Sequence, residues 1–104
     1  MKVSILLPYK ENFSPNYPGA VSLFVKDTSA VSKYKDSVKV YGHTIYKKKL
    51  SNNYVNVKLN KKLFLSNNIL YVKSFLKHEK KRNSDIIEIH NRPKYLELIN
   101  KNSK

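Results

Sequence analysis

The hydrophobic and polar positions of the chain alternate between runs typical of buried strands and stripes typical of amphipathic helices. Lys2 to Pro8 is an apolar run that ends at a proline, which predicts a buried first strand. A polar loop follows, and a helix is expected to open at Gly19. Its predicted inner stripe consists of the positions that recur every three or four residues, namely Ala20, Leu23, Phe24, Thr28 and Val31.

The middle of the chain is expected to add a second strand, from Ser37 to Tyr41, which closes a β-α-β unit with the first. Two more extended segments are predicted around Thr44 to Tyr46 and Tyr54 to Leu59. Ser66 or Asn67 can cap a second helix. The inner side of that helix is predicted to carry Ile69, Leu70, Phe75 and Leu76, and its end is predicted in the charged turn Lys77 to Asn83.

The segment from Asp85 to Pro93 predicts a strand that ends in a polar tip. Its isoleucines are β-branched and suit a short strand buried on both faces of a parallel sheet. The tip consists of His90, Asn91 and Arg92, and a helix beginning at Arg92 or Pro93 is expected to follow, with Tyr95, Leu96 and Ile99 on it. Ligands of open α/β sheets bind beyond the carboxyl ends of the strands, so this tip is the best candidate for a functional site.

Strands that alternate with helices predict one α/β domain, a Rossmann-like half-fold with a mostly parallel sheet flanked by helices and incomplete at its C-terminus. The 104 residues suffice for a single domain. Gly19 and Gly42 are the only glycines, which excludes a Walker loop and a G-x-G-x-x-G fingerprint. No metal site is expected, because the chain lacks cysteine and because His43 and His78 have no partners at ligand spacing. The first apolar run is too short for a signal peptide or a membrane span.

The formal net charge of +14 suggests an anionic partner or a biased composition. Of the 21 basic residues only Arg82 and Arg92 are arginines, whereas phosphate and base recognition usually recruits arginine. An AT-rich genome produces such a lysine excess through its codons, and nucleic acid is therefore the least favoured partner. Between Ser37 and His78 lysines and aromatic residues interleave without any acidic residue. That pattern suits an anionic membrane surface or a single-stranded nucleic acid, and an ordinary solvated face is the alternative.

Three features, in this order, resemble the N-terminal domain of family 4 glycosyltransferases, which are GT-B enzymes of polysaccharide and glycolipid biosynthesis in the cell envelope. These features are the opening strand at Lys2 to Pro8, the glycine-started helix at Pro18 to Val21, and the strand and tip at Asp85 to Pro93. The last is the most specific. The resemblance implies that residues 1–104 form one partial, acceptor-side domain and that the C-terminal donor-binding domain is absent.

The resemblance also implies roles for individual residues. Gly19 and Ala20 match the turn whose backbone approaches the donor diphosphate, although the family's usual second glycine is here Ala20. The tip of His90, Asn91 and Arg92 matches the rim on the acceptor side of the interdomain cleft. A role in acceptor contact or in shaping the cleft is implied for the tip, and direct catalysis is not; the catalytic residues are unknown.

Other interpretations of the same side chains stay open. A histidine at a strand end is often only a hydrogen-bonded structural group, Asn91 suits a tight turn, and Arg92 can solvate a helix start. Glu88 is either buried and paired or exposed at a sheet edge, and it is not expected to be catalytic. The family's paired glutamates, which grip the nucleotide sugar, have no counterpart among Glu79, Glu88 and Glu97.

The expected function is that of a glycosyltransferase domain, inactive alone, from an enzyme that moves sugar from a nucleotide-sugar donor to a glycan or lipid-linked acceptor. The nucleotide sugar is a co-substrate, and no cofactor is expected. A C-terminal glycosyltransferase domain acting in trans and an anionic membrane surface are the other partners considered. The expected location is cytoplasmic, peripheral at the inner face of the membrane. The alternative function is a small basic module that binds nucleic acid or an anionic membrane.

Overall fold

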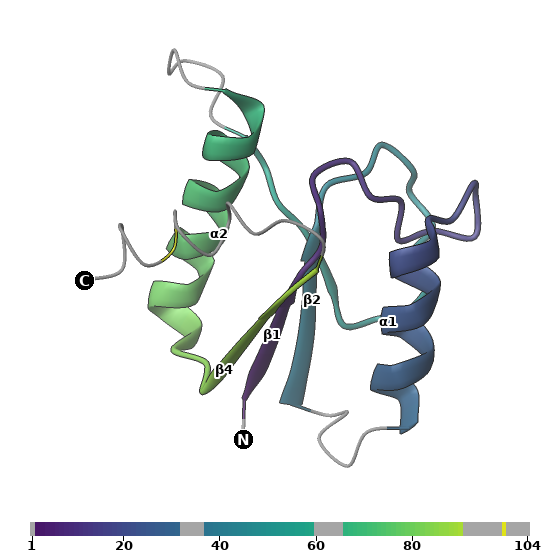
Figure 1. Cartoon of the computed structure of the whole chain (residues 1–104), viewed down its shortest axis with the longest axis horizontal. Helices are drawn as coiled ribbons and strands as arrows, with labels where there is room; N and C mark the ends of the chain where they lie inside the picture. Colours follow the sequence, from purple (N-terminus) through teal and green to yellow (C-terminus); the bar gives the residue numbers. More distant parts are fainter. Residues whose placement is uncertain (1, 32–36, 60–65, 91–98, 100–104) are drawn as a thin grey trace.

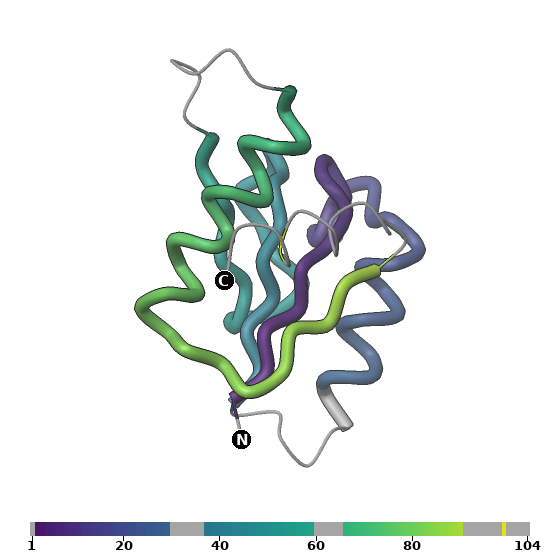
Figure 2. Tube along the Cα trace, turned by 60° about the vertical axis from the view of Figure 1, so that its left-hand side comes forward, coloured from purple at the N-terminus to yellow at the C-terminus, as the bar shows by residue number. Residues whose placement is uncertain are grey.

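The computed structural model of the chain describes residues 2–31, 37–59, 66–90 and 99. Their strands form one all-parallel sheet in the order β3-β2-β1-β4. The helices lie on opposite faces of this sheet (Figures 1 and 2). The predicted parallel α/β, Rossmann-like fold is therefore confirmed. The elements are β1 Val3–Leu6, α1 Ala20–Val31, β2 Val38–Gly42, β3 Tyr54–Asn56, α2 Asn67–Arg82 and β4 Ile86–Ile89.

The strand β1 is the centre of the sheet because it pairs with both β2 and β4. Val3 lies opposite Val38 on one side and opposite Ile86 on the other. On the far side of β2, Val40 lies opposite Tyr54 of β3. The strands β3 and β4 therefore form the two edges of the described sheet.

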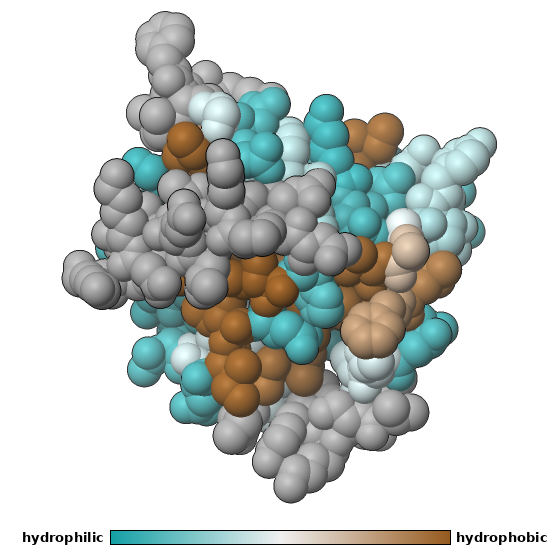
Figure 3. Space-filling view, viewed as in Figure 1, coloured by the Kyte–Doolittle hydropathy of each residue, from teal (hydrophilic) through white to brown (hydrophobic). Residues whose placement is uncertain are grey.

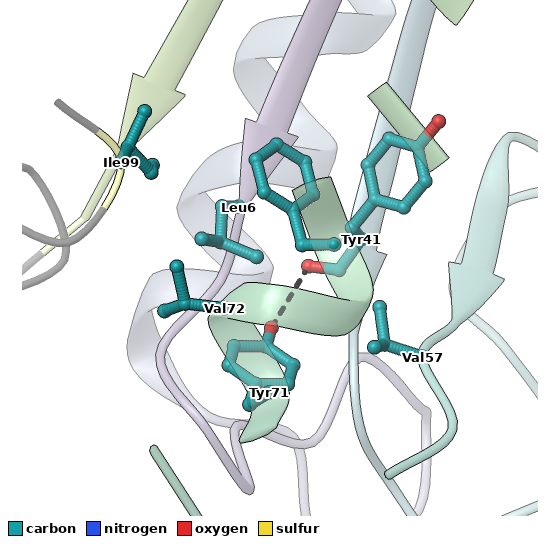
Figure 4. Close-up of a cluster of buried hydrophobic side chains, with 7 residues drawn as sticks. Leu6, Tyr41, Val57, Tyr71, Val72 and Ile99 are labelled. Carbon is teal, nitrogen blue, oxygen red and sulfur yellow. Dashed lines mark hydrogen bonds between the residues drawn. The ribbon is translucent and has the colours of Figure 1, made fainter. Parts of the chain in front are cut away.

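Side chains alternate across the sheet and fill two cores, one under each helix. The core on the α1 side contains Ile5, Leu7, Phe13, Val25, Val38 and Val40. The core on the α2 side contains Leu6, Tyr41, Val57, Tyr71, Val72, Phe75 and Ile99 (Figure 4). Burial of these apolar side chains is the main force that holds the helices against the sheet.

A buried tyrosine fastens α2 to the sheet near the carboxyl ends of the two central strands. The Tyr71 hydroxyl lies 2.6 Å from the carbonyl oxygen of Leu7 and 3.2 Å from that of Tyr41, and the second contact is drawn in Figure 4. Because the Tyr71 side chain is fully buried, these contacts satisfy a polar group that water cannot reach.

The predicted inner stripe of α1 is wrong, although the helix itself is confirmed. Leu23 and Phe24 are 42% and 59% exposed, whereas Ser22, Val25 and Ser29 are buried against the sheet. Small serine side chains allow the helix to approach the sheet closely, and the helix is thereby rotated so that its largest apolar side chains face outward. Ala20 and Thr28 are exposed as well, and the side chain of Val31 lies outside the described part of the chain.

The second helix begins as predicted, at an N-cap formed by Ser66, whose hydroxyl accepts a hydrogen bond from the backbone N–H of Ile69. It continues through the predicted charged turn to Arg82, and Asn83 ends it in the left-handed conformation with φ 52°. Leu70 and Phe75 are buried as expected, and Ile69 and Leu76 are half-buried. The sequence pattern missed three further buried residues, Tyr71, Val72 and Glu79.

The strand β4 is confirmed, but its predicted burial on both faces is wrong. Among the described residues it has a strand neighbour on one side only. Ile86, opposite Val3 on the α1 face of the sheet, is 45% exposed. Thr44 to Tyr46 is a loop rather than the predicted strand, and Thr44 is held by the side chains of Asn12 and Asn56. The helix predicted after Pro93 lies outside the described residues except for Ile99, which is helical and buried. In the described part of the chain, no helix has the length and apolar character needed to cross a bilayer.

Candidate functional site

The residues best suited to bind a ligand lie at the carboxyl edge of the parallel sheet. The four strands run in the same direction, so their carboxyl ends meet at one edge. The chain adds β2 and β3 on one side of β1 and then crosses over to place β4 on the other side. Open α/β sheets bind their ligands at such a change of direction. The space beyond the ends of β1 and β4 is therefore the first candidate site.

Two of the predicted site segments lie together at this edge. Gly19 precedes α1 at the end of the loop that leaves β1, and His90 follows the last residue of β4. The ring of Phe24, in the second turn of α1, lies with its centroid 6.2 Å from that of His90 at an interplanar angle of 67°. The start of α1 and the tip of β4 are thus neighbours in space.

His90 is held by its own strand. Its Nε2 atom lies 3.1 Å from Oε2 of Glu88, two residues earlier on the same face of β4. The His90 side chain is 17% exposed and that of Glu88 is 54% exposed. Of the two alternatives for Glu88, the exposed edge position is therefore the correct one. The carboxylate orients the imidazole, which leaves Nδ1 as the nitrogen available to a ligand.

The other two residues of the predicted tip cannot be placed. Asn91 and Arg92 lie outside the described residues. Their assignment to the acceptor rim stays a prediction.

The start of α1, where a diphosphate was expected to approach, is occupied by a carboxylate of the chain itself. Glu11 Oε2 lies 3.0 Å from the backbone nitrogen of Ser22 and accepts its hydrogen bond. A Cβ atom on Gly19 would lie 1.6 Å from the same oxygen, so the carboxylate fills the space that the glycine leaves. The positive end of the helix dipole favours an anion here. The phosphate role of Gly19 and Ala20 stays a prediction, with the condition that Glu11 moves aside.

A second feature of the same edge is a hollow of about 350 Å³ between the loops that follow β1 and β2. His43, which directly follows β2, lies 2.8 Å through its Nδ1 atom from the carbonyl oxygen of Val57. The ring of Tyr9 stacks on it with a centroid distance of 5.4 Å. The hollow is lined by Lys10, Asn12, His43, Thr44, Ile45 and Tyr46.

A chain of hydrogen bonds fixes the floor of this hollow. The Thr44 hydroxyl donates to Oδ1 of Asn12 over 2.9 Å, and the Thr44 backbone N–H donates to Oδ1 of Asn56 over the same distance. The Tyr54 hydroxyl also donates to Oδ1 of Asn56. Two loops, those that follow β1 and β2, are thus tied to β3 by two asparagine side chains.

Lys49 adds two further contacts to this network. Its ammonium group bonds to the carbonyl oxygen of Tyr46 and lies 5.3 Å from the centroid of the Tyr54 ring. Burial disfavours the charged forms, so it lowers the pKa of Lys49 and raises the pKa of Tyr54. Tyr54 also stacks on Phe13, with centroids 5.2 Å apart. The loop from Thr44 to Lys49 is therefore anchored to the core.

The sequence pattern did not single out His43 as a ligand-binding residue. The signal was present, because His43 follows a strand end just as His90 does. What the sequence lacks is the contact with Val57, which lies 14 residues away. Among the described residues, no group of three histidine, cysteine, aspartate or glutamate side chains is placed to hold a metal ion.

Basic side chains gather in two further hollows beside α2, here called the α2 hollows, of about 370 and 480 Å³. Both are lined by His78, and no described residue in either lining is acidic. The cations of their walls are Lys2, Lys39, Lys58, Lys77, Lys81 and Arg82. These hollows bring six cationic side chains together beside α2.

Comparison with known proteins adds no relative: no family model, no curated protein and no solved structure matches this chain.

Proposed function

We propose that the chain is the acceptor-side domain of a GT-B glycosyltransferase similar to family 4. The observation that carries the proposal is the meeting of the α1 start and the His90 tip at the carboxyl edge, where Phe24 contacts His90. The order of a β1 strand, a glycine-led helix and an Ile-rich strand with a histidine tip is that of the resemblance. An antiparallel sheet, or tips at opposite edges, would have removed its basis.

The open side of the sheet supports the same proposal. The edge strand β4 exposes Ile86, and α1 turns Leu23 and Phe24 outward beside it. Figure 3 shows apolar surface over β4 and the adjoining part of α1. Contiguous exposed apolar surface marks a site where another part of a protein packs. In the proposed enzyme, a further element packed against this face accounts for it.

The roles follow from the chemistry of each group. His90, oriented by Glu88, offers one ring nitrogen to a hydroxyl of the sugar acceptor, and the start of α1 faces the donor diphosphate once Glu11 moves. The nucleotide sugar is held by a second domain. Because these donors are made in the cytoplasm, the proposed location is cytoplasmic, with the enzyme at the inner membrane face when its acceptor is lipid-linked.

The test begins with the genomic reading frame that follows the codon for Lys104. The proposal expects a second α/β domain there, or in an adjacent gene, carrying two glutamates that bind the nucleotide sugar. The complete protein is then incubated with nucleotide sugars and envelope glycan extracts. Acceptor-dependent release of nucleoside diphosphate is the expected result, and a complete protein without such release for any donor contradicts the proposal.

The α2 hollows favour a second candidate function, binding of nucleic acid or an anionic membrane. In the described part of the chain, their walls carry six cations and no carboxylate. The affinity of the chain for a single-stranded oligonucleotide and for phosphatidylglycerol vesicles, measured at two salt concentrations, tests it. Tight binding with a steep salt dependence supports this candidate, and no binding at moderate salt removes it.

A further inference from the structure

The hollow beside His43 is built like a ligand site. A carbonyl oxygen can only accept a hydrogen bond, so the contact with Val57 requires a proton on Nδ1 of His43. In the neutral ring Nε2 then carries the lone pair. Within the described residues no hydrogen bond engages Nε2, and His43 lines the hollow. The stacked Tyr9 ring prevents the imidazole from turning away.

The charge of the hollow points to an anionic ligand. Among the described residues that line it, Lys10 and His43 are basic and none is acidic. The Lys10 ammonium group lies 5.7 Å from the centroid of the Tyr9 ring, on which His43 also stacks. The backbone of Lys10 adopts a positive φ of 68°, which is uncommon for a residue other than glycine. Strained backbone of this type is concentrated at ligand sites, and here it places Lys10 in the lining of the same hollow as His43.

The remaining lining residues suit a sugar-sized molecule. A volume of about 350 Å³ lies at the small end of ligand pockets. Tyr46 and Ile45 supply apolar surface for the C–H face of a sugar ring, and Ile45 is 86% exposed at the rim. The floor is rigid because Thr44 is fixed to both Asn12 and Asn56. A few convergent polar groups on an apolar wall are the usual make-up of such a pocket.

We propose that this hollow binds a monosaccharide unit that bears a phosphate or carboxylate group. Lys10 pairs with the anionic group, Nε2 of His43 accepts a hydrogen bond from a ring hydroxyl, and Tyr46 packs against the ring. The identification of this sugar as part of the glycosyl acceptor rests on the proposed function. Binding of the anionic sugar to the chain does not, because every residue involved belongs to this chain.

The test is a titration of the 104-residue chain followed by NMR, with signals of the His43 ring, Lys10 and Tyr46 as the readout. The probes are glucose 6-phosphate, glucuronate, glucose and inorganic phosphate. We expect both anionic sugars to shift all three sets of signals, with Kd values lower than those of glucose and of inorganic phosphate by roughly tenfold or more. A preference for one anionic sugar distinguishes a phosphorylated acceptor from an acidic one.

Two variants and a control sharpen the result. His43→Asn keeps a side-chain N–H for the Val57 carbonyl but removes the ring nitrogen that faces the ligand, so the fold is retained and the sugar affinity is lost. Lys10→Ala lowers the affinity for anionic sugars to that for glucose. Lys48→Ala removes the same charge from an exposed neighbouring position outside the lining and leaves the Kd unchanged.

Three outcomes overturn the inference. They are no shift with either anionic sugar, inorganic phosphate binding as tightly as glucose 6-phosphate, and His43→Asn binding as well as the unaltered chain. The proposed function stands or falls separately. If the isolated chain binds anionic sugars while the complete protein releases no nucleoside diphosphate, the sugar site is confirmed and the glycosyltransferase assignment fails. If the complete protein releases nucleoside diphosphate while the isolated chain binds no anionic sugar, the glycosyltransferase assignment is retained and the proposed sugar site is wrong.

Discussion

At the scale of single residues, Tyr54 couples stability to alkaline pH. Burial raises the pKa of Tyr54, whereas a tyrosine of the unfolded chain loses its proton near pH 10. Above pH 10 the folded chain therefore binds more protons at this site than the unfolded chain does. The free energy of unfolding should fall as the pH rises beyond that point.

Denaturant unfolding between pH 8 and pH 11 checks this expectation. Tyr54→Phe should cost about 1 kcal/mol at pH 8, through loss of the hydrogen bond to Asn56, and should flatten the alkaline decline. Tyr17→Phe is the matched control, because Tyr17 is 81% exposed and should leave the pH dependence unchanged. If the free energy of unfolding of Tyr54→Phe falls as steeply above pH 10 as that of the unaltered chain, Tyr54 is not the source of the pH dependence.

Arg82 is a second residue that contributes to stability, through the contacts of its guanidinium group. At the end of α2 its Nη2 atom lies 2.9 Å from the carbonyl oxygen of Val3, and its Nε atom lies 3.0 Å from Oγ of the buried Ser4. Nη2 also bonds to the Ser37 carbonyl oxygen. The guanidinium thus joins α2 to β1 and to the residue before β2.

Replacement of Arg82 should destabilise the chain far more than removal of a neighbouring charge. Arg82→Ala is expected to lower the free energy of unfolding by about 3 kcal/mol, and Arg82→Lys should recover only part of it, because an ammonium lacks the planar fork. Lys81→Ala, at an exposed position, should change stability by no more than about 0.5 kcal/mol. Chemical denaturation measures all three, and equal effects of Arg82→Ala and Lys81→Ala would count against the described contacts.

At the scale of elements, α1 has an N-cap supplied from elsewhere in the chain. Gly19 occupies the cap position, since its carbonyl oxygen accepts from the backbone N–H of Leu23, but it has no side chain to offer. Glu11 supplies the missing oxygen to Ser22. Gly19 and Glu11 therefore form the cap together, because the Glu11 carboxylate fits only when the residue at the cap position has no Cβ.

A double-mutant cycle tests this shared cap. Glu11→Ala and Gly19→Ala should each lower the free energy of unfolding by about 1 kcal/mol, within the range for loss of a cap. The double variant should cost about as much as one single variant, because both remove the same contact. Additive losses, measured by thermal or chemical unfolding, would show that Glu11 and Gly19 act independently.

The sequence predicted the elements better than their orientation. The strands and helices could be predicted because apolar runs, turns and caps are local; Ser66, for example, caps α2 through a contact only three residues away. The inner face of α1 could not, because Leu23 and Phe24 fit a stripe as well as Ser22 and Val25 do. Periodicity gives a helix its spacing, whereas the sheet it meets decides which side is buried.

At the scale of the whole molecule, the candidate site depends on contacts that no local pattern contains. The sequence pointed to His90 and Gly19 at the carboxyl edge, and the parallel strand order brings both there. It could not show that Glu11 stands before α1, that β4 is an edge, or that His43 faces a hollow. Each of these results from the way loops of different strands meet.

We propose that the His90 tip serves a glycosyltransferase acceptor site, and the decisive measurement is the kcat/KM for the acceptor. In the complete enzyme, His90→Ala should lower this value by roughly tenfold or more, because the acceptor is no longer held at the carboxyl edge. Lys73→Ala, at an exposed position of α2, should leave it unchanged. A His90→Ala enzyme with the same kcat/KM as the Lys73→Ala enzyme would contradict the account.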